Sequence, residues 1–165
     1  MYAAFFNEID NKKSLSLYCL FKRSSFREEY MFAINDFESA RLKFMARTGC
    51  LGIQENLHTW NIAPSGTCVL CKNGIENVSH FLLTCPAFNE TRIKIWHELE
   101  TKLIISNNLH IWEHFIGSSP TTKLCLLLGD AATEHSIHVG KIFDEACKRF
   151  LKETWPVRKS LVDGT

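Results

Sequence analysis

The chain has 165 residues, and its 19 Lys and Arg against 18 Asp and Glu give a formal net charge of +1. Apolar residues make up 45% of the chain and charged residues 22%, which excludes a long disordered chain and a fibrous protein. The balanced charge also excludes a uniformly basic surface, so binding of nucleic acid would need a local basic patch.

The N-terminal part, residues 1–49, is predicted to be helical. Apolar residues at helical spacing indicate one helix over 15–23 and a second over 27–47. Gly49 follows as a typical helix stop. Residues 50–67 show no clear period, and their turn-forming residues predict a loop with at most a short extended piece.

A helical pattern resumes after Pro86 and runs almost to the end of the chain. Apolar spacing predicts four helical segments, over 88–103, 109–115, 122–128 and 136–155. We expect Pro156 to end the last helix and the tail from 157 to 165 to fray.

The predicted fold is therefore mostly α, a helical domain built around a small irregular Cys3His zinc module. We divide the chain into N-terminal helices (1–49), a zinc-binding module (50–95) and a C-terminal helical region (96–165), together in one compact domain. The central module has too few apolar residues to fold alone, and small modules of this kind need a cross-link such as a bound metal.

The cysteine content indicates the compartment. Seven cysteines are an odd number, which does not suit a disulfide framework. The sequence contains no run of 18 apolar residues, so no membrane span is predicted. Charged residues interrupt the N-terminus where a signal peptide would be apolar. We expect an intracellular protein, in the nucleus or the cytoplasm, with reduced thiols.

Three cysteines and one histidine have the spacing of a zinc site. They are Cys68, Cys71, His80 and Cys85, in the pattern Cys-x2-Cys-x8-His-x4-Cys. Three thiolates and one imidazole close a tetrahedral zinc shell and leave no position for a substrate, so we expect one structural Zn²⁺. The alternative is four unrelated residues, packed thiols and a core histidine. Core packing is also the expectation for the other four cysteines, Cys19, Cys50, Cys125 and Cys147.

Pro86 helps the last two ligands of this set to converge. On a regular helix, residues five apart diverge by about 140°. Because Pro86 disfavours helix at Cys85, the chain can turn there and direct the sulfur toward the metal.

These motifs resemble a known family. They resemble the zinc-binding (Cys-Cys-His-Cys) C-terminal region of reverse transcriptases from non-LTR, LINE-type, retrotransposons. The segments that carry the resemblance are Arg47-Thr48-Gly49, the Cys68–Cys71 pair, Glu76, the His80–Pro86 segment and Arg92. The resemblance spans about residues 40–95 and implies a C-terminal domain of a retroelement protein, or a stand-alone protein derived from one, that grips template RNA or target DNA without catalysis. Lys72 stands where the family often has glycine, which leaves the turn type open.

No catalytic pattern accompanies the metal site. The aromatic-x-Asp-Asp signature of a polymerase is absent, and His110 and His114 lack the adjacent glutamate of a zinc protease, because Ile111 follows the first histidine. We expect no enzyme and no small-molecule substrate.

Basic and aromatic residues beside the zinc module provide candidate nucleic-acid contacts. We predict one phosphate-binding face formed by Lys43, Arg47, Lys72 and Arg92, with Trp60 stacking on an unpaired base. The alternatives are a solvated helical face for the charges and packing on the module for Trp60. The other function that the sequence leaves open is a protein-interaction or scaffold protein in which zinc is purely structural.

Overall fold

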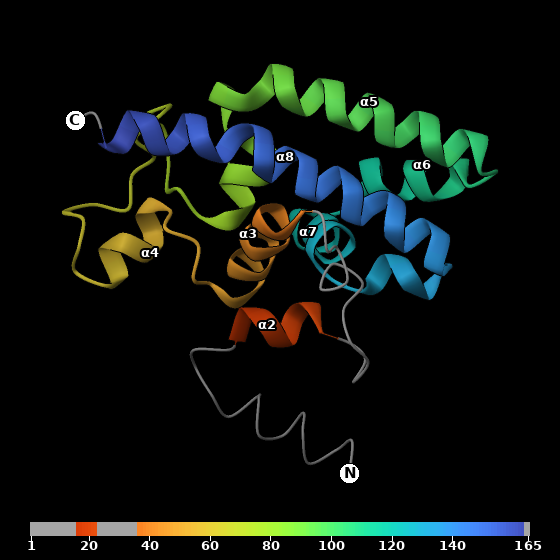
Figure 1. The fold of residues 1–165 in the computed structure, drawn as a ribbon, viewed down its shortest axis with the longest axis horizontal. Helices are drawn as coiled ribbons and strands as arrows, with labels where there is room; N and C mark the ends of the chain where they lie inside the picture. Colours follow the sequence, from red (N-terminus) through yellow and green to blue (C-terminus); the bar gives the residue numbers. More distant parts are fainter. Residues whose placement is uncertain (1–15, 23–35, 164–165) are drawn as a thin grey trace, which may run out of the picture.

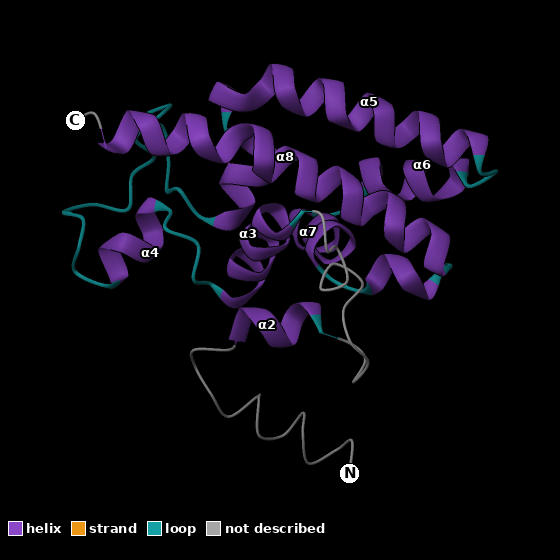
Figure 2. Cartoon of the chain, viewed as in Figure 1, coloured by secondary structure: helices purple, strands orange, loops and turns teal. Residues whose placement is uncertain are grey.

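The computed structural model describes residues 16–22 and 36–163, and within these residues the regular structure is helical (Figures 1 and 2). The α-helices are α2 (Ser16–Phe21), α3 (Phe37–Thr48), α4 (Gln54–Thr59), α5 (Asn89–Ile105), α6 (Leu109–Gly117), α7 (Pro120–Leu128) and α8 (Ile137–Asp163). A π-helical turn, η3 (His80–Thr84), and two 3-10 turns, η4 (Pro86–Phe88) and η5 (Ala131–Glu134), complete them. The mostly α fold class is confirmed.

Helix α8 is the central element. It runs antiparallel to α5 and also packs on α3, α7 and η5 (Figure 1). The antiparallel register places Lys102 opposite Glu145 and Glu98 opposite Arg149, and both pairs form ion pairs across the two helices. Residues far apart in the sequence therefore meet along α8.

One continuous cluster of buried apolar residues holds the described elements together. Phe150 of α8 lies near its middle, with its ring centroid 6.0 Å from that of Phe81 in η3 and 5.9 Å from that of Trp96 in α5. Aromatic pairs at this separation add to the stabilisation that apolar burial provides. The segment that carries the metal ligands thus shares its core with the long helices.

Most helix boundaries agree with those predicted from the sequence, and two differences matter. Helix α3 ends at Thr48, and Gly49 caps it with a left-handed φ of 71°, as predicted. The segment 50–67 contains a short helix, α4, that has too few residues for a period to be visible. The proposed start of the second helix, residues 27–35, lies outside the described residues.

The prediction that the last helix ends at Pro156 is wrong. Helix α8 continues through Pro156 to Asp163, so the tail up to that residue is helical. A proline in a helix interior removes one backbone hydrogen bond and costs about 3 kcal/mol. Side-chain contacts on both sides of Pro156, from Trp155 and Arg158, offset this cost.

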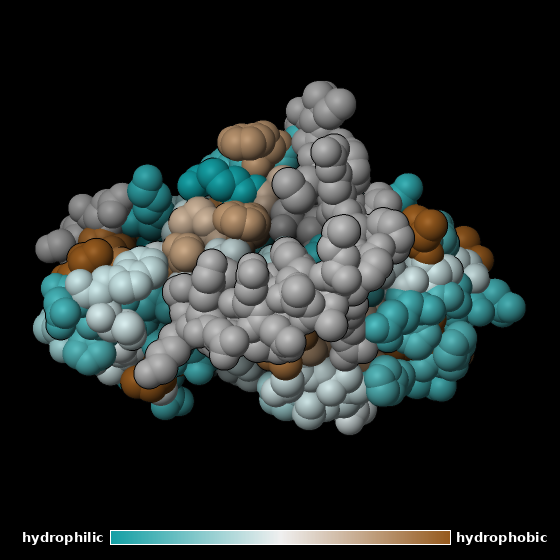
Figure 3. All heavy atoms as spheres, turned by 90° about the horizontal axis from the view of Figure 1, so that it is seen from below, coloured by the Kyte–Doolittle hydropathy of each residue, from teal (hydrophilic) through white to brown (hydrophobic). Residues whose placement is uncertain are grey.

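Among the described helices, none combines the length and the apolar character needed to cross a membrane. Exposed apolar side chains are scattered over several elements, and the face seen in Figure 3 shows separate brown patches among teal ones. The more exposed examples are Phe37, Ile62, Ile93, Ile105 and Ile137.

Candidate metal centre

The first two ligands lie on a tight turn between Gly66 and Glu76. The Cys68 N–H donates to the Gly74 carbonyl at 3.0 Å, and the Lys72 N–H donates back to the Cys68 carbonyl at 2.9 Å. Lys72 and Gly74 both have left-handed backbones, with φ of 56° and 81°. The turn therefore forms with lysine at the position where the family often has glycine, at a cost of about 1 kcal/mol for a side chain in that region.

The other two ligands lie at the two ends of the π-helical turn η3. The Cys85 N–H donates to the His80 carbonyl at 2.7 Å, an i to i+5 hydrogen bond. This wider turn brings residues five apart onto nearly the same side, which a regular helix would not do. Cys85 has a ψ of 119°, the extended value that the following Pro86 favours, so Pro86 ends the turn as predicted.

The four side chains converge on one point. The Cys68 and Cys85 sulfurs are 3.8 Å apart, the Cys71 sulfur lies 3.3 Å from His80 Nε2, and all four ligand atoms lie within 4.8 Å of one another. Zn–S bonds of about 2.3 Å at tetrahedral angles place two sulfurs about 3.8 Å apart, so the residues fit the ion. Cys68 and Cys85 are buried, and Cys71 and His80 are partly exposed.

The surroundings shift the pKa values of the four ligands in different directions. Burial raises the pKa of the Cys68 thiol and raises the pKa of Cys85 to about 12. Burial opposes ionisation of Cys71 as well, but the Asn73 N–H, 3.4 Å from its sulfur, helps to lower its pKa. Burial lowers the pKa of His80 and keeps the imidazole neutral, the form that binds metals. The other ring nitrogen of His80, Nδ1, lies 3.4 Å from Thr84 Oγ1, the kind of contact that orients a metal-binding histidine.

Arg92 supports the π-helical turn from inside the protein. Its guanidinium donates to the carbonyls of Leu82 at 2.9 Å, Cys85 at 3.1 Å and Phe81 at 3.4 Å. Burial lowers the pKa of Arg92, while the nearby Cys85 acts to raise it. A zinc ion with three thiolates and one histidine carries a net charge of −1, so a buried cation beside it provides the compensating charge.

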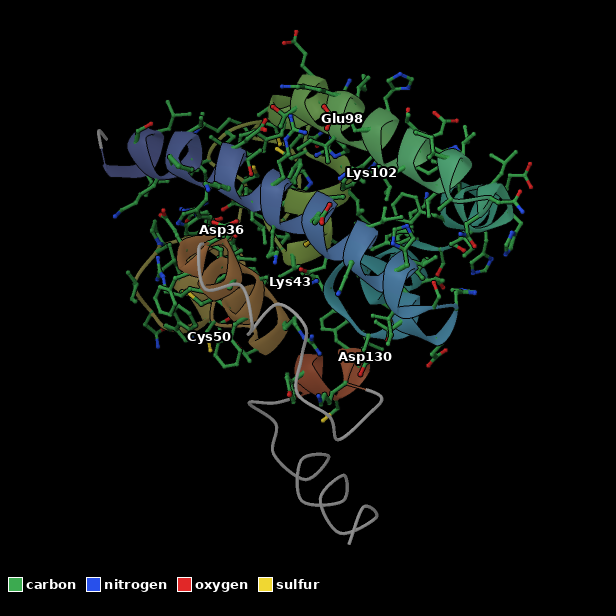
Figure 4. The ribbon with its side chains drawn as sticks, turned by 45° about the vertical axis from the view of Figure 1, so that its right-hand side comes forward. Asp36, Lys43, Cys50, Glu98, Lys102 and Asp130 are labelled. Carbon is green, nitrogen blue, oxygen red and sulfur yellow. The ribbon has the colours of Figure 1, made fainter. Side chains whose placement is uncertain are left out.

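The predicted phosphate-binding face is wrong for three of its four cations. Lys43 is buried against Asp144, Arg47 is fully buried with its guanidinium carbon 5.5 Å from the centre of the Tyr18 ring, and Arg92 is buried under the turn. Each cation lies on the side of its helix that packs on the core, so it cannot meet a phosphate in solvent. Figure 4 shows Lys43 on the side of α3 that faces α8. Lys72 and Trp60 remain exposed, Trp60 with 45% of its surface.

A buried ion pair that the sequence analysis missed lies at the base of the turn. The Glu76 carboxylate accepts from Arg158 Nε at 3.0 Å, from Arg158 Nη2 at 2.8 Å and from the Gln54 N–H at 2.7 Å. Arg158 was missed because the helix was expected to end at Pro156. If the helical pattern is continued past the proline, Arg158 falls on the same side as Phe150 and Leu151, about two turns earlier.

The remaining cysteines do not join the centre. Cys125 and Cys147 are buried as expected, Cys19 is partly buried, and Cys50 is exposed at the end of α3 (Figure 4), where core packing was expected. Burial raises the pKa of Cys147 to about 11.

Comparison with known proteins agrees with this geometry. Residues 16–96 match the family model described as zinc-binding in reverse transcriptase. No curated protein and no solved structure matches the chain. The matched region contains all four ligands, and its Cys3His group is suited to one zinc ion. This part of the chain is therefore similar to the zinc-binding regions of reverse transcriptases.

Proposed function

We propose that the chain is a non-catalytic, zinc-stabilised module that contacts RNA or DNA in a protein of retroelement origin. The observation that carries the proposal is the family match over the metal centre, because a reverse transcriptase works on nucleic acid strands. Such a module needs no small-molecule substrate, and it would act in the nucleus or the cytoplasm, where these strands occur.

The surface of the zinc module supports a small contact area. Lys72 is exposed on the metal-binding turn and offers a cation to a phosphate. Trp60, at the end of α4, is half-exposed and offers a flat ring to an unpaired base. Because Lys43, Arg47 and Arg92 are buried, we expect weak binding without sequence preference.

The closed ligand set supports the non-catalytic part of the proposal. Three thiolates and one imidazole occupy the four positions of a tetrahedral zinc ion, so neither water nor substrate has a place on the metal. Within residues 16–22 and 36–163, no second group of three or more His, Cys, Asp or Glu side chains has metal-binding spacing.

Titration of labelled single-stranded RNA and DNA at two salt concentrations tests the proposal. One or two phosphate contacts predict a log–log salt slope of about −0.7 to −1.4. Lys72→Glu should abolish binding and Trp60→Ala should weaken it, while both variants keep their zinc. Lys94→Glu, a charge reversal at an exposed lysine of α5, is the matched control and should bind less than twofold more weakly.

The second candidate function is protein interaction, and one groove favours it. The groove holds about 540 Å³ and lies between the zinc module, α5, α6 and the start of α7. Its walls include Trp96, Trp112 and Phe115, with the exposed Ile93 and Ile116 at its edge. The lining also includes Arg92, Glu100 and Lys123, and aromatic side chains with charges of both signs suit a protein surface better than a phosphate backbone. Absence of nucleic acid binding at low salt, where attraction between charges is strongest, would favour this function.

A further inference from the structure

The Glu76–Arg158 ion pair connects the metal centre to a part of the chain beyond the family match. The match ends at residue 96, whereas Arg158 lies near the end of α8. Both side chains are buried, with exposures of 0% for Glu76 and 3% for Arg158. Two guanidinium donors meet the carboxylate, the bidentate arrangement that gives the strongest directional contact between these groups.

Glu76 also fixes the backbone that carries the first two ligands. Its N–H donates to the Gly66 carbonyl at 2.9 Å, and its carbonyl accepts from the Glu55 N–H at 3.2 Å. The first bond closes the turn that holds Cys68 and Cys71, and the second joins this turn to the start of α4. A shift of Glu76 would therefore move the two sulfurs relative to the rest of the centre.

The same part of α8 also packs against the segment that carries the other two ligands. Arg158 lies over the ring of Trp155, with its guanidinium carbon 5.1 Å from the ring centre. Trp155 packs edge-on against Phe81 at 6.0 Å, and Phe81 directly follows the ligand His80. One helical turn of α8 thus contacts Glu76 and Phe81, one residue from each of the two segments that carry the ligands.

We propose that Arg158 is a positioning residue of the zinc site, so that zinc affinity and the docking of the end of α8 depend on each other. Arg158 acts through Glu76 and holds the Cys68–Cys71 turn in register with the His80–Cys85 turn. It also neutralises the Glu76 carboxylate, a further negative charge near a metal cluster of net charge −1. This inference concerns the metal site and does not depend on the proposed contact with nucleic acid.

The test measures zinc affinity of the full chain by competition with a chelating dye. We expect the Kd for zinc to rise about 10- to 100-fold in Arg158→Met, the range for loss of an orienting partner, with a smaller rise in Arg158→Lys. Arg149→Met and Arg149→Lys are the matched controls, because Arg149 is also an ion-paired arginine of α8 but pairs with Glu98 and Glu153. Their Kd should stay within about twofold of the parent.

Two further readouts separate positioning from general stabilisation. With Co²⁺ in place of zinc, the visible bands of the metal should shift in the Arg158 variants and not in the Arg149 variants, because the bands report ligand geometry. Linkage also requires the reverse effect, so removal of zinc should increase amide hydrogen exchange at the end of α8 around Arg158 more than in α7.

The outcomes decide the proposal even where a variant is unstable. If Arg158→Met does not fold, the comparison of Arg158→Lys with Arg149→Lys decides on the same criteria. A Kd within twofold of the parent and unchanged Co²⁺ bands in the folded Arg158 variants would overturn the proposal, even if their melting temperatures fall equally with and without zinc. That last pattern would make Arg158 a residue of general stability.

Discussion

Lys43 Nζ donates to Asp144 Oδ1 at 2.7 Å and joins α3 to α8 across 101 positions of the sequence. Lys148, one turn further along α8, meets the other oxygen of Asp144 at 2.6 Å. All three side chains are largely buried, so the charges serve the packing of two helices and not an external ligand. A cation that seemed available for phosphate is thus part of an interior network.

Asp144→Asn tests this network through its dependence on pH. Burial opposes ionisation of Asp144, but Lys43 and Lys148 outweigh it and hold its pKa below the usual value. A carboxyl whose pKa is lowered on folding contributes stability above its unfolded pKa of about 3.9, and this contribution is lost as the pH falls through the folded pKa. At pH 7 we expect the variant to lose about 3 kcal/mol in urea unfolding. The difference from the parent should disappear at a pH below both values, and a constant difference would contradict the assignment.

Loss of a metal ligand should remove the response to zinc. Cys71→Ser replaces a thiolate by a hydroxyl, a far poorer ligand, so we expect its zinc content and its melting temperature to fall. Circular dichroism with and without a chelator measures the effect. The exposed Cys50 provides the control, because Cys50→Ser should keep both zinc and the parent melting temperature. If Cys71→Ser melts like the parent whether or not chelator is present, zinc does not hold the fold.

Arg92→Met should destabilise the protein through the π-helical turn. The change leaves the carbonyls of Leu82 and Cys85 without their buried donor, which costs about 2 to 4 kcal/mol in total. Chemical denaturation measures this loss, and the zinc content reports on the ligands. Lys94→Met, on the exposed side of the same helix, should change stability by less than about 0.5 kcal/mol. Equal stability of the two variants would contradict an interior role for Arg92.

Pro156→Ala should stabilise the end of α8. Alanine restores the N–H that proline lacks and removes the clash of the ring with the preceding turn, a gain of about 1 to 3 kcal/mol. The rise in melting temperature measures the gain, and Val157→Ala at the neighbouring exposed position is the control. A lower melting temperature for Pro156→Ala would mean that the helix is shaped around the proline.

Lys72→Gly tests how much free energy the left-handed backbone at Lys72 costs in the metal-binding turn. Glycine tolerates the left-handed φ of 56° that lysine adopts there, but it also gives the unfolded chain more freedom. We expect full zinc content and a stability within about 1 kcal/mol of the parent, whereas Lys72→Val should be less stable because a branched side chain is strained in that region. Thermal unfolding of the zinc-loaded proteins ranks the three. A valine variant as stable as the glycine variant would show that the turn bears no strain.

Two features could be predicted from the sequence alone because their causes are local. Helical periodicity repeats every few residues, so it predicted α5, α6, α7 and most of α8. The ligand set follows from four residues within one short stretch and the turn that Pro86 favours, and these four side chains do converge.

What only the tertiary structure decided was the surroundings of the charged groups. Whether Lys43 meets solvent or Asp144 depends on how α3 packs on α8, and a helical pattern has no information about a carboxylate 101 positions away. Likewise the propensity of Pro156 to end a helix is a local effect of a few kcal/mol, and the buried pair of Arg158 with Glu76, together with the packing of Trp155, outweighs it. Local preferences determined the elements and the ligands, whereas contacts between distant segments determined which cations are buried and how far the last helix extends.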